Sequence, residues 1–211
     1  MQTQAGDAGE FRRFDLSRVP SPCFVVDEVA VERNLSILRD VADQSGAQVL
    51  SALKAFSMFS LASLVRRYLS GTCASGLFEA RLAREEYGGT VVTYCAGYKA
   101  SEIDQIISLS DHLIFNSTAQ KDRFLPNVLA SGRPVHVGLR INPEHSEGEI
   151  AKYDPCAPGS RLGMPISQLD HAALEGVDGL HMHTLCEQGF EPLERTWAAI
   201  EDRIKPYLGQ L

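Results

Sequence analysis

The sequence lacks the cysteine patterns that build disulfide-bonded or zinc-binding domains. Its five cysteines are scattered, odd in number and never spaced as CxxC, which disfavours both a zinc knuckle and a disulfide framework. Residues 1–14 mix acids with arginines and contain no apolar run, so no secretory signal is expected. No apolar segment approaches the ~20 residues of a membrane span. These absences predict a cytoplasmic protein with reduced thiols and no membrane partner.

Basic charge is also scarce. The net charge is −7, and a nucleic-acid-binding protein needs a basic face, so no nucleic-acid partner is expected. No GxGxxG motif follows an early strand, which weakens a dinucleotide-binding interpretation. What the chain does have is 211 residues with 44% hydrophobic composition, enough for one well-buried core.

Strand patterns alternate with helical patterns along most of the chain. Short apolar runs predict six strands, at residues 49–54, 72–75, 91–95, 112–116, 135–142 and 179–184. An early helix carries Val31, Leu35, Leu38 and Val41. Further helices are predicted at residues 59–69, 77–87 and 101–108. Another begins at Ser117, where Gln120 has the spacing of a capping box, and a weaker one follows residue 163. The last helix carries Leu193, Trp197, Ile200 and Ile204 on one face.

This alternation predicts an α/β protein with a parallel sheet and helices outside it. Six βα units can be counted, whereas a closed (β/α)8 barrel has eight and typically ~250 residues. We therefore expect an incomplete TIM-type barrel over residues 20–211, preceded by a flexible segment, residues 1–19. A doubly wound open sheet is the competing architecture.

Active-site groups of parallel barrels lie where the strands end. The predicted strand ends are Lys54, Ser75, Cys95, Asn116, Arg140 and His183. A lysine that closes an apolar strand is partly desolvated, which lowers its pKa and favours the neutral amine that attacks an aldehyde. A surface lysine just beyond the strand is an equally good interpretation of the spacing.

Three further features of these segments suggest chemistry. His181 and His183 are two residues apart on a strand and therefore point the same way, which fits a metal pair, a packed core histidine, or a ring that stacks on a flat cofactor. Arg140 ends an apolar strand, so it either contacts a ligand or forms an ion pair with a neighbouring strand. The loop 154–163 contains two prolines and two glycines, and its Arg161 offers a guanidinium for a carboxylate or phosphate.

Four segments together resemble a known family. They are Ser51-Ala52-Leu53-Lys54-Ala55-Phe56, Leu139-Arg140-Ile141-Asn142-Pro143-Glu144, Cys156-Ala157-Pro158-Gly159-Ser160-Arg161-Leu162-Gly163 and His181-Met182-His183-Thr184-Leu185-Cys186-Glu187-Gln188. From about Pro20 onwards the chain is similar to carboxynorspermidine and carboxyspermidine decarboxylases. These enzymes belong to the alanine-racemase-fold group and depend on pyridoxal 5'-phosphate (PLP).

The resemblance implies a role for particular residues. Lys54 matches the lysine that carries the cofactor, and His183 the histidine that stacks on its ring. Arg140 and Ser75 match positions near the cofactor. The remaining implied contacts, to substrate and active-site closure, are Arg161, Cys186 and Glu187. A glutamate at 187 suits a polyamine ammonium, although it would also suit the start of the next helix.

The family also implies parts that this sequence does not contain. Its members continue with two more βα units, which bring a glycine-rich phosphate site and a carboxylate for the ring nitrogen, and with a β-rich domain that completes the site across a homodimer interface. We therefore expect the longer parent to be the enzyme and this chain to be inactive or nearly so. Ornithine- or diaminopimelate-type specificity, a non-catalytic PLP-binding half-barrel and a metal-dependent hydrolase remain as alternatives.

Overall fold

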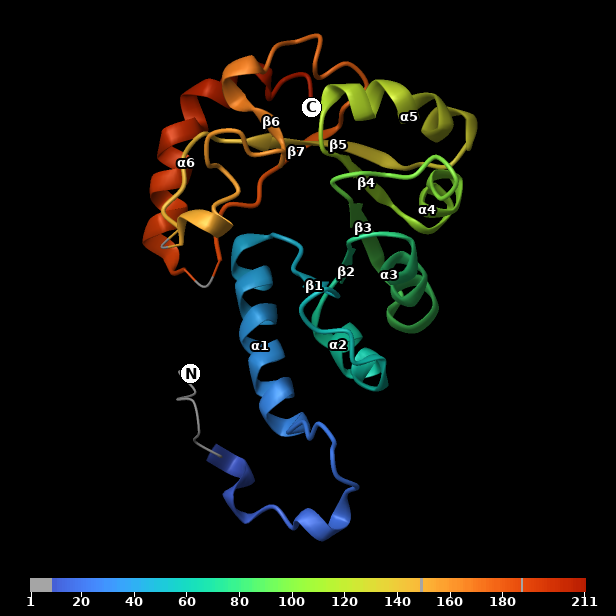
Figure 1. Cartoon of the computed structure of the whole chain (residues 1–211), viewed down its shortest axis with the longest axis vertical. Coiled ribbons are helices and arrows are strands. Elements are labelled where there is room, and N and C mark those ends of the chain that lie inside the picture. Colours follow the sequence, from blue (N-terminus) through green and yellow to red (C-terminus); the bar gives the residue numbers. More distant parts are fainter. Residues whose placement is uncertain (1–8, 149, 187) are drawn as a thin grey trace.

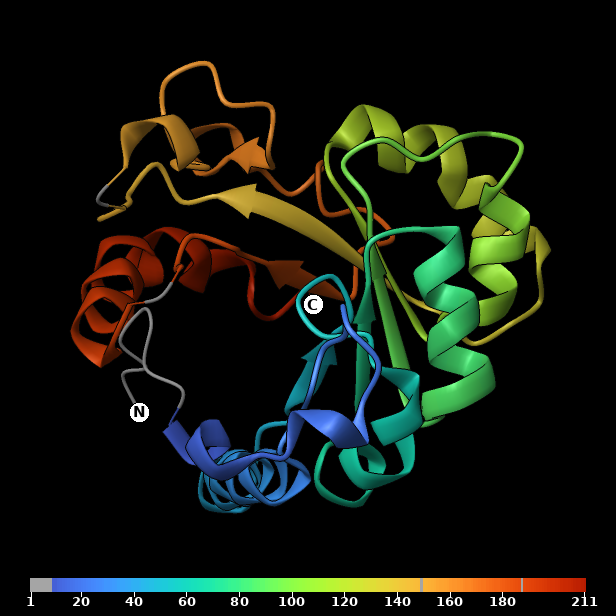
Figure 2. The ribbon, with the colours of Figure 1, turned by 60° about the horizontal axis from the view of Figure 1, so that its bottom comes forward.

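A curved sheet of parallel strands runs through the middle of the molecule (Figures 1 and 2). The structure, a computed structural model, describes residues 9–148, 150–186 and 188–211. Its strands are β1 (Leu50–Ala52), β2 (Gly71–Ala74), β3 (Thr90–Tyr94), β4 (His112–Phe115), β5 (His136–Asn142), β6 (Met164–Pro165) and β7 (Gly179–His181). They pair in sequence order from β1 to β6, and β7 pairs with β5 as well.

β5 has two partners besides β4. Its residues Gly138 to Arg140 pair with β7, as in Arg140 opposite His181, and its last two residues pair with the short β6. Every pairing in the described sheet is parallel. β1 and β7 each pair with one neighbour only, so the sheet is an open part of a barrel, which confirms the predicted fold class.

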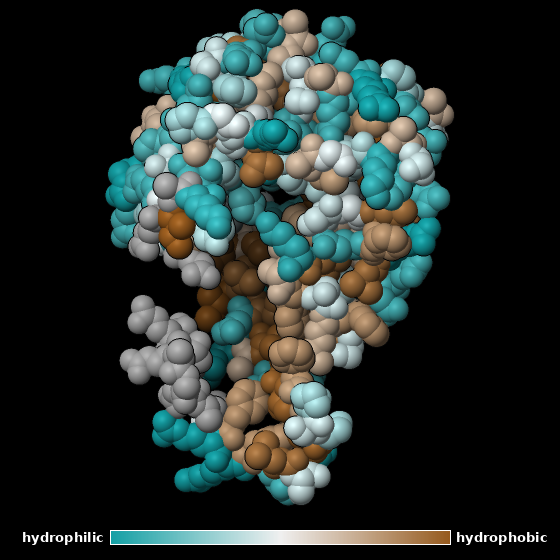
Figure 3. Space-filling model, in the orientation of Figure 1, coloured by the Kyte–Doolittle hydropathy of each residue, from teal (hydrophilic) through white to brown (hydrophobic). Residues whose placement is uncertain are grey.

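Helices cover the outer face of this sheet (Figure 2). They are α1 (Glu28–Ser45), α2 (Ala62–Tyr68), α3 (Leu77–Leu82), α4 (Ile103–Leu109), α5 (Thr118–Ala130) and α6 (Phe190–Ile204). The predicted cap of α5 is confirmed, since Ser117 Oγ accepts the Gln120 amide at 3.2 Å. α1 and α6 lie at the two ends of the curved sheet, and the face between them is hollowed, with hydrophobic residues along its wall (Figures 1 and 3).

Strand alternation sends one set of side chains outward to the helices and the other inward. Leu113, Phe115 and Leu139 are fully buried against α4 and α5 in the larger core cluster. A smaller cluster joins Leu53 of the β1 end to Val65 of α2. Because successive strand residues face opposite sides, the residues between these core positions point into the barrel, where the candidate site lies.

Three expectations need correction or comment. The first strand ends at Ala52 rather than at Lys54, which lies in the following turn. The weak helix expected after residue 163 is wrong, because residues 166–168 form a 3-10 turn and residues 171–176 form turns. Of the predicted flexible segment, residues 1–8 lie outside the described residues, and residues 9–13 and 16–18 form 3-10 turns.

There is a physical reason why the segment after residue 163 does not form the predicted helix. Two of its backbone carbonyls are bonded from elsewhere, since Lys121 Nζ donates to Glu175 O at 2.9 Å and Tyr207 Oη donates to Leu169 O at 2.8 Å. Tertiary hydrogen bonds thus replace the helical ones. Among the described helices, none is both long and apolar enough to cross a membrane.

Candidate functional site

Three of the predicted strand-end residues, Lys54, Arg140 and His183, belong to one group on the inner side of the sheet. Arg140 of β5, His181 of β7 and Tyr94 of β3 are in contact there. The charges of Lys54 and Arg140 both act on the two histidines, 181 and 183, so these five residues form one electrostatic group. We call them the strand-end group.

Arg140 is a buried cation with unusual surroundings. Its side chain is 5% exposed, its Cζ lies 4.8 Å from the centre of the Tyr94 ring, and Nη2 donates to the His183 carbonyl at 3.3 Å. Within the described residues, no carboxylate lies at ion-pair distance from Arg140. The ion-pair alternative for this arginine therefore has no support there, and its charge is available to an anion.

His181 is the buried histidine of the pair. Its ring stacks on Tyr94 with centroids 5.2 Å apart and planes 32° apart. Burial, followed by the positive charges of Arg140, His183 and Lys54, lowers the pKa of His181 to about 4. Its Nδ1 is buried with no hydrogen-bond partner in the described part of the chain. His181 is therefore neutral at ordinary pH and acts as a flat wall of the barrel interior.

Lys54 and His183 lie at the open rim of the same group. Both are exposed; the partial desolvation that we expected of the lysine is therefore not found. Partial burial of the His183 ring, then the charges of Lys54 and Arg140, lower the pKa of His183. Lys54, like Arg140, has no ion-pair partner among the described residues. The site thus combines the exposed Lys54 and His183 with the buried Arg140, and neither of the two cations has an ion-pair partner in the described part of the chain.

Tyr94 is a functional candidate that the sequence did not reveal, whereas Asn116 was predicted as a strand end but without its contacts. Tyr94 Oη donates to Asn116 Oδ1 at 2.8 Å, and the Asn116 amide also holds the backbone of Arg161 and Gly163. The signal for Tyr94 was its place in β3, because it alternates with the core residues Val91 and Thr93. Without the fold, nothing distinguished it from an ordinary strand tyrosine.

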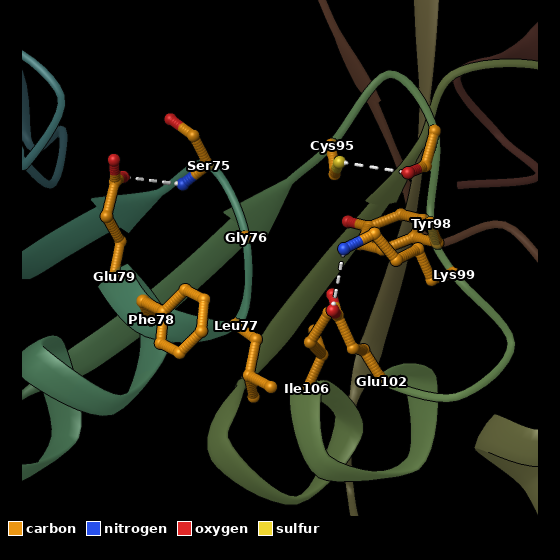
Figure 4. A pocket seen from close by; sticks show the side chains of 11 residues that line it. Ser75, Gly76, Leu77, Phe78, Glu79, Cys95, Tyr98, Lys99, Glu102 and Ile106 are labelled. Atoms are coloured by element: carbon orange, nitrogen blue, oxygen red, sulfur yellow. Dashed lines mark hydrogen bonds and ion pairs between the residues drawn. The ribbon is translucent and has the colours of Figure 1, made fainter.

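Ser75 lies apart from the strand-end group. It lines a cavity of about 310 Å³ between the turns that follow β2 and β3, together with Cys95 and Tyr98 (Figure 4). Its amide donates to Glu79 Oε2 at 2.7 Å, and Cys95 Sγ contacts the Gly97 carbonyl at 3.3 Å. Ser75 and Cys95 thus line the same cavity, and no described contact joins Ser75 to Arg140 or Lys54.

The three residues expected to contact the substrate have no described contact with the strand-end group. Arg161 and Cys186 are both exposed, on the loops that precede β6 and follow β7. Glu187 lies outside the described residues. The described part of the chain contains no group of three or more histidine, cysteine or acidic side chains placed to hold a metal ion.

The low pKa of His181 predicts a pH-dependent stability. An unfolded histidine takes up its proton near pH 6.5 and this one at about 4, so between these values the unfolded state binds more protons and stability falls as pH falls. Moving from about pH 7.5 to about pH 5 should cost about 2 kcal/mol through this residue. His181→Phe keeps the stack on Tyr94 without titrating. Urea denaturation of both proteins at the two pH values measures the difference, and an equal pH dependence would contradict the assignment.

Comparison with known proteins confirms the resemblance seen in the sequence. The chain is 39% identical over 196 residues to carboxyaminopropylagmatine decarboxylase of Synechocystis, and 34% identical over 194 residues to carboxynorspermidine/carboxyspermidine decarboxylase of Campylobacter jejuni. These matches cover 93% and 92% of the chain, but it spans about half the length of the curated relatives it matches. No protein-family model matches.

Solved structures agree with this relationship. Carboxynorspermidine decarboxylase from Campylobacter jejuni, crystallised with norspermidine, superposes with a TM-score of 0.81 at 33% identity, over 92% of this chain and 49% of that one. Diaminopimelate decarboxylase from Helicobacter pylori superposes with a TM-score of 0.69 at 19% identity, over 85% of this chain and 48% of that one. The second match supports the shared fold alone.

Proposed function

We propose that this chain provides the cofactor-binding strands of a PLP-dependent decarboxylase, which removes the α-carboxylate of carboxynorspermidine or carboxyspermidine and releases norspermidine or spermidine and CO2. The observation that carries the proposal is the pair of cations, Lys54 and Arg140, near the His183 imidazole, neither of which has an ion-pair partner among the described residues. They lie at the strand ends of a fold shared with such decarboxylases.

The residues present fit PLP, which is an anionic, flat aldehyde. Lys54 is an exposed primary amine, the nucleophile that an aldehyde requires. Arg140 is a buried cation with no carboxylate beside it in the described chain, so an anionic group would satisfy it. When bound, the cofactor supplies a ring system that accepts the electron pair left behind as CO2 departs.

The other residues have roles set by their positions. His183, neutral because of its lowered pKa, can lie against a flat ring at the rim. Ser75 is proposed as a more distant cofactor contact, since its cavity opens at the same ends of the strands. Lys54 can also hold a proton near the carbon that loses CO2, because its ammonium has no other partner in the described chain.

The substrate is proposed to extend over the exposed loops. A carboxylated polyamine combines an α-amino acid with several ammonium groups, so it needs both a cation and an anion from the protein. Arg161 would bind a carboxylate, and Glu187, with Cys186 beside it, would lie along the polyamine. The relative from Synechocystis adds carboxyaminopropylagmatine as a third candidate substrate. We further propose that the enzyme acts in the cytoplasm as a homodimer, which light scattering on the purified protein would test.

The test of this function is CO2 release. A polypeptide that carries this sequence, supplied with PLP, would be assayed with carboxynorspermidine, carboxyspermidine, carboxyaminopropylagmatine, ornithine and diaminopimelate. Turnover of a carboxylated polyamine supports the proposal. Turnover of ornithine or diaminopimelate alone would favour the amino-acid decarboxylase alternative. Cofactor binding without CO2 from any of the five would favour a non-catalytic PLP-binding half-barrel.

A further inference from the structure

The side-chain amide of Asn116 pairs with a loop backbone much as one strand pairs with another. Its Nδ2 donates to the Arg161 carbonyl at 2.8 Å, and its Oδ1 accepts the Gly163 amide at 2.9 Å. One side chain thus holds both backbone groups on either side of Leu162. Asn116 is 9% exposed and directly follows β4, and its backbone N–H donates to Gln120 Oε1 at 2.7 Å.

Asn116 is connected to Arg140 through Tyr94. The Tyr94 hydroxyl donates to the same Oδ1 at 2.8 Å, and the centre of the Tyr94 ring lies 4.8 Å from Arg140 Cζ. The amide oxygen therefore receives two hydrogen bonds, one from the barrel interior and one from the loop. With Nδ2 also bonded, the amide has one orientation that satisfies both ends.

Gly163 brings this loop against β5. Its φ is +86°, and a Cβ there would lie 2.9 Å from Asn142 N and 3.1 Å from Arg140 Cγ. Only glycine allows so close an approach at a positive φ. The loop backbone is thus pressed beside Arg140 on one side and bonded to Asn116 on the other, two residues from the exposed Arg161.

From these contacts we infer that Asn116 is a positioning residue, which fixes the Arg161 segment relative to Arg140 and so sets the distance between two cationic sites. The ligand part of the inference rests on the proposed function: Arg140 faces the cofactor side of the site, and Arg161 binds a carboxylate of the substrate. Asn116 is proposed to contact neither the cofactor nor the substrate, and to act through the Arg161 backbone and through Tyr94.

The experiment is limited trypsin digestion of the whole chain, followed by mass spectrometry. Cleavage after Arg161 requires the loop backbone to leave Asn116. In Asn116→Ala, this cleavage is expected to be at least about tenfold faster than in the native chain, because two backbone hydrogen bonds and one from Tyr94 are lost. Cleavage after Arg67, an exposed residue within α2, should not change, since it reports general unfolding.

Two further variants complete the design. Asn127→Ala is the matched control, because it loses a single exposed hydrogen bond, to Asp104 at 2.9 Å, and should cleave like the native chain. Asn116→Asp keeps the side-chain size and the hydrogen-bond acceptor but cannot donate to the Arg161 carbonyl. It replaces Asn116→Ala in the digestion experiment if the alanine variant does not fold. An unchanged rate after Arg161 in both Asn116 variants overturns the inference, and so does an equal rise after Arg67.

A ligand measurement separates this inference from the proposed function. Carboxynorspermidine added to the native chain with PLP should slow cleavage after Arg161 several-fold, because a bound carboxylate covers that side chain. If the ligand has no effect while Asn116→Ala still accelerates cleavage, Arg161 is not the substrate contact and the proposed function loses that residue. The positioning of the loop by Asn116 would stand.

Discussion

Replacing Lys54 with alanine is expected to abolish covalent attachment of PLP to the chain. Lys54 is the lysine whose positive charge acts on both His181 and His183, and a primary amine is the group that reacts with an aldehyde. The native chain, treated with PLP and then with borohydride, should carry one reduced adduct on the peptide that contains Lys54. The variant should carry none there.

Two controls make this result specific. Lys54→Arg keeps the positive charge without a reactive amine, so it should also lose the adduct. Lys99→Ala removes a lysine that lines the neighbouring cavity and is paired with Glu102 at 2.9 Å, and it should leave the adduct intact. Equal labelling of Lys54 and of other lysines would show that PLP reacts with the surface at random, and the proposed function would fall.

Replacing Arg140 with methionine is expected to change stability and cofactor binding in opposite directions. The buried guanidinium has no counter-charge among the described residues, and the Tyr94 ring and the His183 carbonyl offset its desolvation only in part, so the free energy of unfolding should rise by about 1 kcal/mol or more on its removal. The same change takes away the cation that an anionic cofactor would meet. PLP affinity should fall by about 30-fold or more, the scale of a lost buried charge contact.

Arg84→Met is the matched control for this experiment. Arg84 lies in the helical segment Ala83–Tyr87 that follows α3, where it is paired with Asp111 at 2.9 Å and donates to the Leu109 carbonyl. Its loss should lower stability and leave PLP affinity unchanged. Urea denaturation and absorbance titration with PLP measure the two quantities. If Arg140→Met is destabilised and binds PLP normally, the arginine is a structural residue and its proposed cofactor contact is wrong.

The fold was predictable where burial and local pattern agree. The strands at 91–95 and 112–116 were predicted to within one residue, because each is a short run rich in apolar, β-branched or aromatic residues. The segment after β6 shows the opposite case. Four buried residues there have helical spacing: Ile166, Leu169, Ala173 and Leu174. They nevertheless lie in turns and loops, because side chains from distant parts of the sequence hydrogen-bond to backbone carbonyls of this segment.

The site was predictable as a set of strand ends but not as a set of contacts. Lys54, Arg140 and His183 could be predicted as candidates because parallel strands end on one edge. Whether Arg140 has a counter-charge depends on every element around it, so the absence of one among the described residues could not be predicted from a local pattern. The contact of Asn116 with Arg161 joins residues 45 positions apart in the chain, and hydrogen bonds of that separation depend on the completed fold.

The double pairing of β5 has a consequence for how this molecule can vary. Because Ile141 pairs with Met164 and Asn142 with Pro165, residues 143–163 leave and rejoin the sheet at one point. The pairing of β5 with β7 lies earlier along the strand, at Gly138 to Arg140, and is independent of that loop. Lengthening a loop whose ends are already joined costs little, since closure entropy grows slowly with length. Insertions and deletions between Pro143 and Gly159 can therefore reshape the proposed substrate side while the strands that carry the proposed cofactor residues keep their register.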